Sequence, residues 1–246
     1  VEEAHPRVDD VGAAAAAGGA HLVGVALNVS PLLLSLEVAT CSTLVAGVAA
    51  LGLIALTHGR RVARVLDAVL TAPLVLPPTV LGYYLLTALG VRSALGAAFE
   101  SVTGSSMVFT RTGAVIAAAV TAFPLVLQSA RAAVDAVDPR LLDAARTLGA
   151  TRFAALRRVA FSLASRGLVA GLLLGFALAI GDFGVTLMVA GNIPGETQTA
   201  SLALYDALAA GRDDDARALA VTLTVFAVVL IAAVQWLTRR AHADSR

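Results

Sequence analysis

Long apolar runs alternate with short arginine-rich segments along this chain of 246 residues. A helix that crosses a bilayer needs about 20 mostly apolar residues, because its backbone groups must bond within the helix. Five runs meet this requirement and predict membrane spans over residues 31–56, 68–89, 108–130, 167–190 and 218–237. The pattern therefore predicts an all-α integral membrane protein, a bundle of five transmembrane helices.

The N-terminal segment is less apolar than the five runs. Residues 11–29 carry no charge, but alanines, glycines, His21 and Asn28 dilute their hydrophobicity. We interpret residues 1–29 as an extracytoplasmic or interfacial lead-in, and a sixth span over 11–29 is the alternative. Residues 30–240 then form the transmembrane domain, followed by a short tail over 241–246.

Arginine positions predict the direction of the spans, because basic residues are retained preferentially on the cytoplasmic side. Alternate connections are basic, so five spans place the N-terminus outside and the C-terminus in the cytoplasm. The arginines of the basic segments are Arg60, Arg61, Arg64, Arg131, Arg140, Arg146, Arg152, Arg157, Arg158, Arg166, Arg239, Arg240 and Arg246. Three ionisable residues near span ends, Glu37, Arg111 and Arg131, are expected to reach toward the lipid headgroups.

Composition excludes several classes of function. Hydrophobic residues make up 58% of the chain and charged residues 14%, whereas soluble domains have about 45–50% and about 25%. The net charge of +1 is too small for a nucleic-acid-binding surface. All 18 basic residues are arginine, so the chain lacks the lysine of a phosphate loop. One cysteine and four scattered histidines offer no metal-ligand spacing, and we expect neither a metal nor a cofactor in this chain.

The longest basic connection, residues 138–162, has the pattern of a helical elbow. Asp138 suits an N-cap and Pro139 the first helical position. Gly149 supplies the left-handed residue that ends this helix, and Thr151 caps a second one. Two short amphipathic helices joined at a glycine are therefore predicted on the cytoplasmic side. On amphipathicity alone, an ordinary surface loop whose arginines only anchor the topology is the alternative.

A motif in this segment resembles the coupling loop of ABC importer permeases. That family has Glu-Ala-Ala, three residues, Gly, nine residues, Ile, one residue and Leu-Pro. Here Asp143, Ala144, Ala145, Gly149 and Val159 stand at the corresponding places. The Leu-Pro pair is replaced by Phe161 and Ser162, so the helix is expected to continue into the fourth span. The resemblance implies a type I importer permease whose elbow docks onto a separate ATPase subunit.

Two other segments, residues 73–83 and 181–206, resemble molybdate transporter permeases. The resemblance implies a bacterial cell-membrane protein that translocates molybdate into the cytoplasm without an ATPase site of its own. ATP and Mg²⁺ would be bound by two ATP-binding cassette subunits, and an extracytoplasmic molybdate-binding protein would deliver the substrate. Because five helices make a small bundle, we also expect a second copy of the chain, a homodimer. Close small-residue spacings, Gly171 to Gly175 and Ala46 to Ala50, fit either that dimer or packing inside one subunit.

The candidate pathway or gating residues interrupt predicted spans. Prolines remove backbone donors and kink a helix, which suits either a pathway or simple packing. An acid between two glycines in the membrane caps a helix start, pairs with an arginine or lines the pathway. These candidates are Pro77, Pro78, Pro124, Gly181, Asp182 and Gly184.

A polar turn follows the fourth predicted span on the outer side. Its sequence suits either docking of the substrate-delivery protein or a simple connection between helices. The candidate docking residues are Asn192, Pro194, Gly195, Thr197 and Gln198.

Other functions remain as alternatives at this stage. A permease for tungstate, sulfate or another oxyanion would have the same span chemistry. An intramembrane hydrolase would need a base at depth, and no histidine lies in the five predicted spans. A passive membrane scaffold or channel would leave the Asp143 to Gly149 motif without a role.

Overall fold

The computed structural model describes residues 29–58 and 62–243, and every regular element in these ranges is a helix. Three of them are long and apolar enough to cross a membrane: α2 (Val29–Thr57), α6 (Arg111–Asp135) and α13 (Asp213–Ala243). Two bent helix pairs pass the same test together, which gives up to five spans when each bent pair counts as one. The predicted all-helical membrane bundle is confirmed, whereas the candidate sixth span lies outside the described residues.

The bent pairs and the connections contain the shorter helices. One pair joins α3 and η2 to α4, and the other joins the segment α8–η3–α9 to α10. These shorter helices are α3 (Val62–Leu70), η2 (Ala72–Leu74), α4 (Pro78–Leu89), α5 (Ala94–Thr103), α7 (Pro139–Thr147), α8 (Arg152–Ala155), η3 (Leu156–Ala160), α9 (Phe161–Leu163), α10 (Ser165–Gly181), α11 (Gly184–Ala190) and α12 (Ala200–Ala209).

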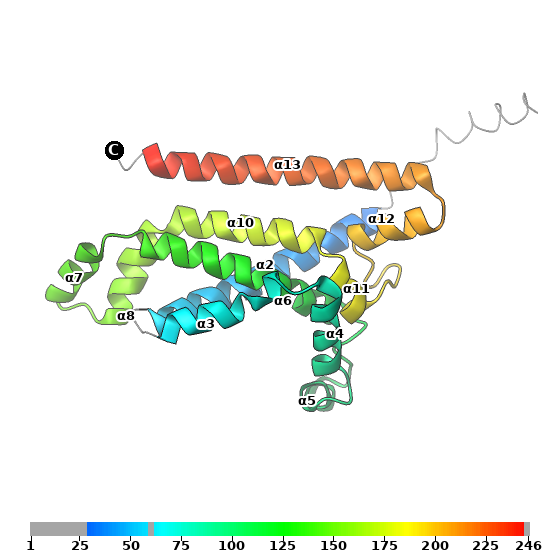
Figure 1. The fold of residues 1–246 in the computed structure, drawn as a ribbon, viewed down its shortest axis with the longest axis horizontal. Helices are drawn as coiled ribbons and strands as arrows, with labels where there is room; N and C mark the ends of the chain where they lie inside the picture. Colours follow the sequence, from blue (N-terminus) through cyan, green and yellow to red (C-terminus); the bar gives the residue numbers. More distant parts are fainter. Residues whose placement is uncertain (1–28, 59–61, 244–246) are drawn as a thin grey trace, which may run out of the picture.

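Figure 1 shows an elongated bundle with two different ends. We call the end with α7 and α8 the elbow end, and the end with α11 and α12 the far end. Helices α2, α6 and α10 run between the two ends, and α13 lies along the outside of α10 for nearly the whole length (Figure 1). The α4–α5 hairpin projects from the bundle near the far end.

Helix α6 lies at the centre of the packing. One face contributes Val126, Leu127, Ala130 and Val134 to a core with α2 and the elbow. Ala114, Ala118 and Ala122 pack in a second core, with α2, α10 and Ala190 of α11, and Ala117 packs in a third with α4 and α11. Small side chains let neighbouring backbones approach closely from several directions, which is how helices associate where lipid removes the hydrophobic driving force.

Three glycines of α10, spaced four residues apart, pack against α6. A Cβ atom at Gly167 would lie 2.6 Å from Ala133 Cβ, and one at Gly171 would lie 2.7 Å from Ser129 Cβ. A Cβ atom at Gly175 would come closer still to Val126 Cγ2. The small-residue spacing of Gly171 and Gly175 therefore serves packing inside one subunit, as does Ala46 to Ala50, which is buried in the core with α6.

Two predicted spans are broken rather than continuous. The second span bends by 109° where α4 begins at Pro78, because Pro77 is extended and neither proline has an N–H to continue the preceding helix. The fourth span was predicted to reach residue 190, and this end is wrong. Helix α10 stops at Gly181, Asp182 is extended, and α11 is a separate helix packed on α4 and α6.

The entry into the fourth span also differs from expectation. A continuous helix was predicted from Phe161 onward because the proline of the family motif is missing. The chain instead turns by 73° at Ala164, directly after a π-helical turn over Leu156–Ala160 and the short α9. Ala164 has a ψ of −3°, away from the helical value of about −42°, so this chain makes the corner at Ala164 without proline.

Two helices at the far end were expected only as connections. Ser93 caps α5 through Gly96 N–H, and Gly96 lies so close to the Gly90 carbonyl that a side chain would not fit. Helix α12 begins at Ala200, whose N–H donates to Ser35 Oγ on α2 over 2.7 Å. With 10 residues α12 is too short to cross a membrane, and it pairs with α13 instead.

The glycine contacts predict that an added side chain destabilises the protein at Gly175 but not at Gly52. Gly175→Leu places a side chain against Val126, so we expect the protein to lose about 1–3 kcal/mol of stability from overpacking. Gly52→Leu is the matched control, because no atom lies within 4 Å of a Cβ built at Gly52 on α2. Thermal unfolding in detergent measures both, and equal midpoints for the two variants would contradict the assignment of α10–α6 packing.

Candidate functional site

A cavity of about 560 Å³ lies where the two broken spans meet. Four of the candidate pathway residues line it: Pro78 from α4, Gly181 and Asp182 from the end of α10, and Gly184 from α11. The remaining wall comes from η2, α4, α6, α10 and α11. These lining residues are Pro73, Leu74, Leu76, Thr79, Leu81, Thr121, Leu178, Phe183 and Val185. Residues more than 100 positions apart in the sequence therefore form one cavity at the two helix breaks.

Asp182 holds the break in the fourth span together. Its Oδ2 accepts hydrogen bonds from Thr186 N–H over 3.2 Å and from Thr186 Oγ1 over 2.5 Å. Its backbone carbonyl accepts from Ser201 Oγ on α12 over 2.8 Å. The carboxylate thus satisfies donors in the first turn of α11 from the position before its N-cap, Phe183, and Asp182 also lines the cavity, so the geometry fits both the capping and the pathway-lining roles.

Close contact between α4 and α11 depends on Gly184. A Cβ atom there would lie 2.7 Å from Pro78 Cβ, so only glycine lets the two helix starts meet. Pro77 precedes α4 and is not among the lining residues. Pro124 is fully buried inside α6 and also lies away from the cavity. The burial of Pro124 fits the packing alternative.

The chemistry of the cavity wall is mainly apolar, with the hydroxyl-bearing Thr79 and Thr121 among the carbon-lined surfaces. The Thr121 hydroxyl already donates to the Ala117 carbonyl over 2.9 Å. Within residues 29–58 and 62–243, no three His, Cys, Asp or Glu side chains gather closely enough to hold a metal ion. The described wall therefore offers few polar groups that could hold a solute.

The elbow has the caps that its sequence predicts. Asp138 accepts from Arg140 N–H and starts α7, and Thr151 accepts from Ala154 N–H and starts α8. Gly149 between them has a φ of +89°, the left-handed conformation that favours glycine. Each of these local features follows from residues within a few positions, so the pattern alone was enough to find them.

Three large apolar side chains are exposed on the elbow, among its exposed arginines. Leu148 is 89% exposed, and Leu141 and Phe153 are also exposed. No residue of α7 is buried. Of the motif residues, Asp143, Ala144 and Gly149 are exposed while Ala145 and Val159 are half-buried, and Asp143 pairs with Arg146 over 3.3 Å.

The loop 191–199 at the far end separates the candidate docking residues into two groups. Pro194 and Gly195 are exposed, and Asn192 is half-buried. Thr197 and Gln198 are buried, and Thr197 Oγ1 accepts from Ile193 N–H while donating to the Gly191 carbonyl. The side chains of Thr197 and Gln198 are therefore turned inward, where Thr197 shapes the loop, and they present no docking surface here.

Arg111 fastens this loop to the bundle. Its Nε donates to the Glu196 carbonyl over 3.2 Å and its Nη2 to the Gly195 carbonyl over 3.1 Å. Glu37 on α2 lies 3.6 Å from the same guanidinium. From the sequence, Arg111 is expected to reach toward headgroups or to bias anion entry at the outer mouth. Its contact with Gly195, 84 positions away, is not marked by any local pattern.

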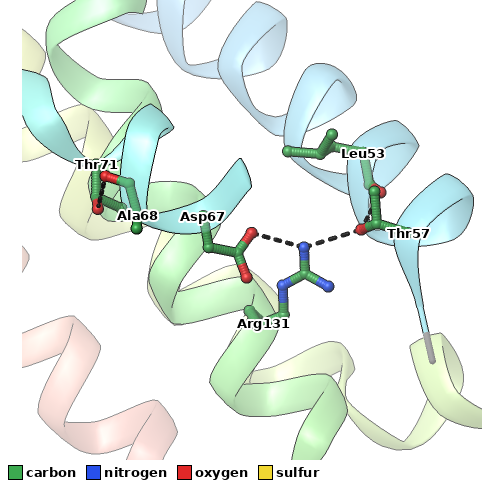
Figure 2. A network of polar contacts seen from close by, with 6 residues as sticks. All are labelled: Leu53, Thr57, Asp67, Ala68, Thr71 and Arg131. Atoms are coloured by element: carbon green, nitrogen blue, oxygen red, sulfur yellow. Dashed lines mark hydrogen bonds and ion pairs between the residues drawn. The ribbon is translucent and has the colours of Figure 1, made fainter. Parts of the chain in front are cut away.

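Arg131 is also not a solvated span end, as Figure 2 shows. Its guanidinium points between α2 and α3, where it meets Asp67 and Thr57. The prediction that Arg131 reaches toward headgroups is wrong, because partners on two other helices satisfy its charge inside the bundle.

Comparison with known proteins agrees with this architecture. Residues 43–244 match the family model described as binding-protein-dependent transport system inner membrane component. The molybdenum transport system permease protein ModB of Escherichia coli (strain K12) is 39% identical over 175 residues, covering 71% of this chain and 76% of that protein. ModB of Haemophilus influenzae is 37% identical over 176 residues, covering 71% and 77%.

More distant relatives extend the comparison. The sulfate transport system permease protein CysT of Salmonella typhimurium is 30% identical over 175 residues, covering 71% of this chain and 63% of that protein. A solved amino acid ABC transporter chain has a TM-score of 0.60 at 18% identity, with 90% of this chain and 97% of that chain covered. This similarity shows the type I ABC permease fold. With the family model matching most of its length, the chain belongs to the binding-protein-dependent transport system inner membrane components, the multi-pass membrane subunits of ABC importers.

Proposed function

We propose that this chain is the permease subunit that carries molybdate into the cytoplasm, driven by ATP hydrolysis in a separate subunit. The observation that supports this proposal most strongly is the chain's 39% identity to a molybdenum permease over 76% of that protein's length. A sulfate permease matches at 30% over 63% of its length, so sulfate is the weaker alternative. Tungstate, an ion of similar size and charge, remains an alternative on the same scaffold.

The elbow is the surface that we assign to the ATPase. Exposed apolar side chains on it, above all Leu148, gain from burial in a partner groove. Gly149 fixes the angle between α7 and α8, and small Ala144 allows close approach. With no lysine for a phosphate loop in the chain, ATP and Mg²⁺ are assigned to two ATP-binding cassette subunits.

The elbow end is assigned to the cytoplasm and the far end to the outside, in agreement with the arginine distribution. The C-terminus then lies inside and the N-terminus outside. At the far end, Pro194 and Gly195 are exposed, and we assign this loop to contact with an extracytoplasmic molybdate-binding protein. Substrate selection is then made by the binding protein, which fits the largely apolar cavity wall.

A second copy of the chain completes the pathway in this proposal. The α4–α5 hairpin projects from the bundle (Figure 1). On α4, the side chains of Tyr83 and Tyr84 are each 56% exposed. The cavity beside Pro78, Gly181 and Asp182 is the candidate pathway in each subunit. A dianion does not dissolve in hydrocarbon, so the dimer must supply a polar passage beside the mainly apolar cavity of each subunit, and this passage must never be open at both ends.

Substrate identity is tested by ATPase activity in liposomes that contain this chain, its ATPase subunit and its binding protein. We expect molybdate and tungstate to stimulate hydrolysis and sulfate to have no effect. Stimulation by sulfate alone would support the importer function but identify sulfate, not molybdate, as the substrate. A chain that assembles with no ATPase subunit would overturn the proposal.

The elbow assignment is tested by Gly149→Leu. A side chain at a φ of +89° costs about 1–2 kcal/mol and changes the bend, so we expect uptake and ATPase assembly to be lost while membrane insertion is kept. Gly211→Leu is the matched control, because Gly211 also has a positive φ, +69°, and open space around it, but lies in the α12–α13 turn. Normal uptake by Gly149→Leu would contradict the elbow assignment.

A further inference from the structure

One ion pair connects three helices at the elbow end (Figure 2). Arg131 Nη2 on α6 lies 2.7 Å from Asp67 Oδ1 on α3 and donates to Thr57 Oγ1 on α2 over 3.0 Å. Thr57 Oγ1 in turn donates to the Leu53 carbonyl over 2.7 Å. The guanidinium therefore bridges the end of one span and the start of the next.

Burial makes this pair energetically different from the other ion pairs described. The side chains of Arg131 and Asp67 are only 14% and 28% exposed, whereas both side chains of Arg217–Asp214 are at least 80% exposed. Exposed pairs contribute little, but removing one partner of a shielded pair leaves the other charge uncompensated. Arg131 Nε is buried without a hydrogen-bond partner among the described residues, so this guanidinium depends strongly on Asp67.

Helix α3 is otherwise weakly attached to the bundle. Val65 and Val69 point outward and are 65% and 64% exposed. None of the α3 residues whose side chains are described is buried, and Leu70 at its end packs only partly against the core. The charge pair is thus the most specific tie between α3 and α6, and it can break without disrupting a packed core.

The position of the pair relates the elbow to the cavity. Arg131 lies four residues before the end of α6, and α7 of the elbow begins at Pro139. Asp67 lies five residues before η2, and the segment that follows provides Pro73, Leu74, Leu76 and Pro78 to the cavity wall. A shift between α3 and α6 would therefore reach the cavity wall from one side and the elbow from the other.

We propose that Arg131 and Asp67 form a latch that couples the elbow to the broken second span, so that elbow movement changes the cavity wall. The inference rests on the importer function proposed above. Both are positioning residues, which act through α3 and η2 and touch no substrate. With the latch removed, α3 no longer follows α6, and ATP hydrolysis proceeds without control by substrate.

The test is the ratio of molybdate-stimulated to basal ATPase activity in the reconstituted complex, measured with its binding protein. Asp67→Asn keeps the shape of the side chain and removes its charge. We expect this variant to assemble, with basal hydrolysis raised and the ratio lowered by at least about fivefold, the range of ordinary coupling energies. Arg131→Gln should behave in the same way.

Reversal of the pair separates coupling from folding. The double variant Arg131→Asp with Asp67→Arg should recover the ratio to within about twofold of the unaltered complex, whereas each reversed single variant should not. Arg217→Gln and Asp214→Asn are the matched controls, since they neutralise an exposed pair whose loss should leave the ratio unchanged.

Two results would overturn the latch. One is an assembled Asp67→Asn complex whose ratio equals that of the unaltered protein. The other is a reversed pair that folds and assembles yet is as uncoupled as its single variants. If the unaltered complex itself shows no stimulation by molybdate, tungstate or sulfate, the importer proposal fails, a result distinct from either of these.

Discussion

Close packing around α6 is the constraint on which the rest of the molecule depends. In a membrane, apolar side chains gain little by leaving lipid for protein, so helices associate through close contacts between small residues. Here Gly167, Gly171 and Gly175 bring α10 onto α6, and buried alanines bring in α2, α4 and α11. Helices α2, α10, α11 and η2 all pack directly on this one helix.

The broken spans supply what a rigid bundle lacks. A continuous helix satisfies all its backbone groups and offers neither a cavity nor a corner. The breaks at Pro77 and Asp182 open a cavity between their ends, and the bend at Ala164 turns the chain into the elbow. At the second break, Asp182 accepts hydrogen bonds from Thr186 and Ser201. These bonds pair backbone groups that the interrupted helix would otherwise leave without a partner.

The two ends of the bundle are joined to its centre by arginines. Arg111 fastens the far-end loop through two carbonyl oxygens, and Arg131 ties α3 to α6. Arginine suits both places because its planar guanidinium donates in several directions while it remains charged. Both contacts join segments that meet only in the folded chain, so changes at either end can pass to α6 through single side chains.

The apolar runs, the helix caps and the elbow motif could be predicted from the sequence, because each depends on residues only a few positions apart. Hydrophobic runs located the bundle, and Asp138, Gly149 and Thr151 located the elbow. The glycines around Asp182 indicated a break in the fourth span. They did not indicate that α11 is a separate helix outside that span. The continuous helix expected at the entry to the fourth span was wrong, because the chain bends at Ala164 without a proline.

Contacts between distant segments were decided only in three dimensions. Arg131 and Asp67 are 64 residues apart, and hydropathy treats each as an isolated charge near a span end. The burial of Thr197 and Gln198 depends on how the loop folds back on itself and against the bundle, which no local pattern contains. The cavity likewise needs α4, α6, α10 and α11 together. Local patterns specify helices and their ends, whereas the packing of side chains between helices specifies which charges pair and which polar groups turn inward.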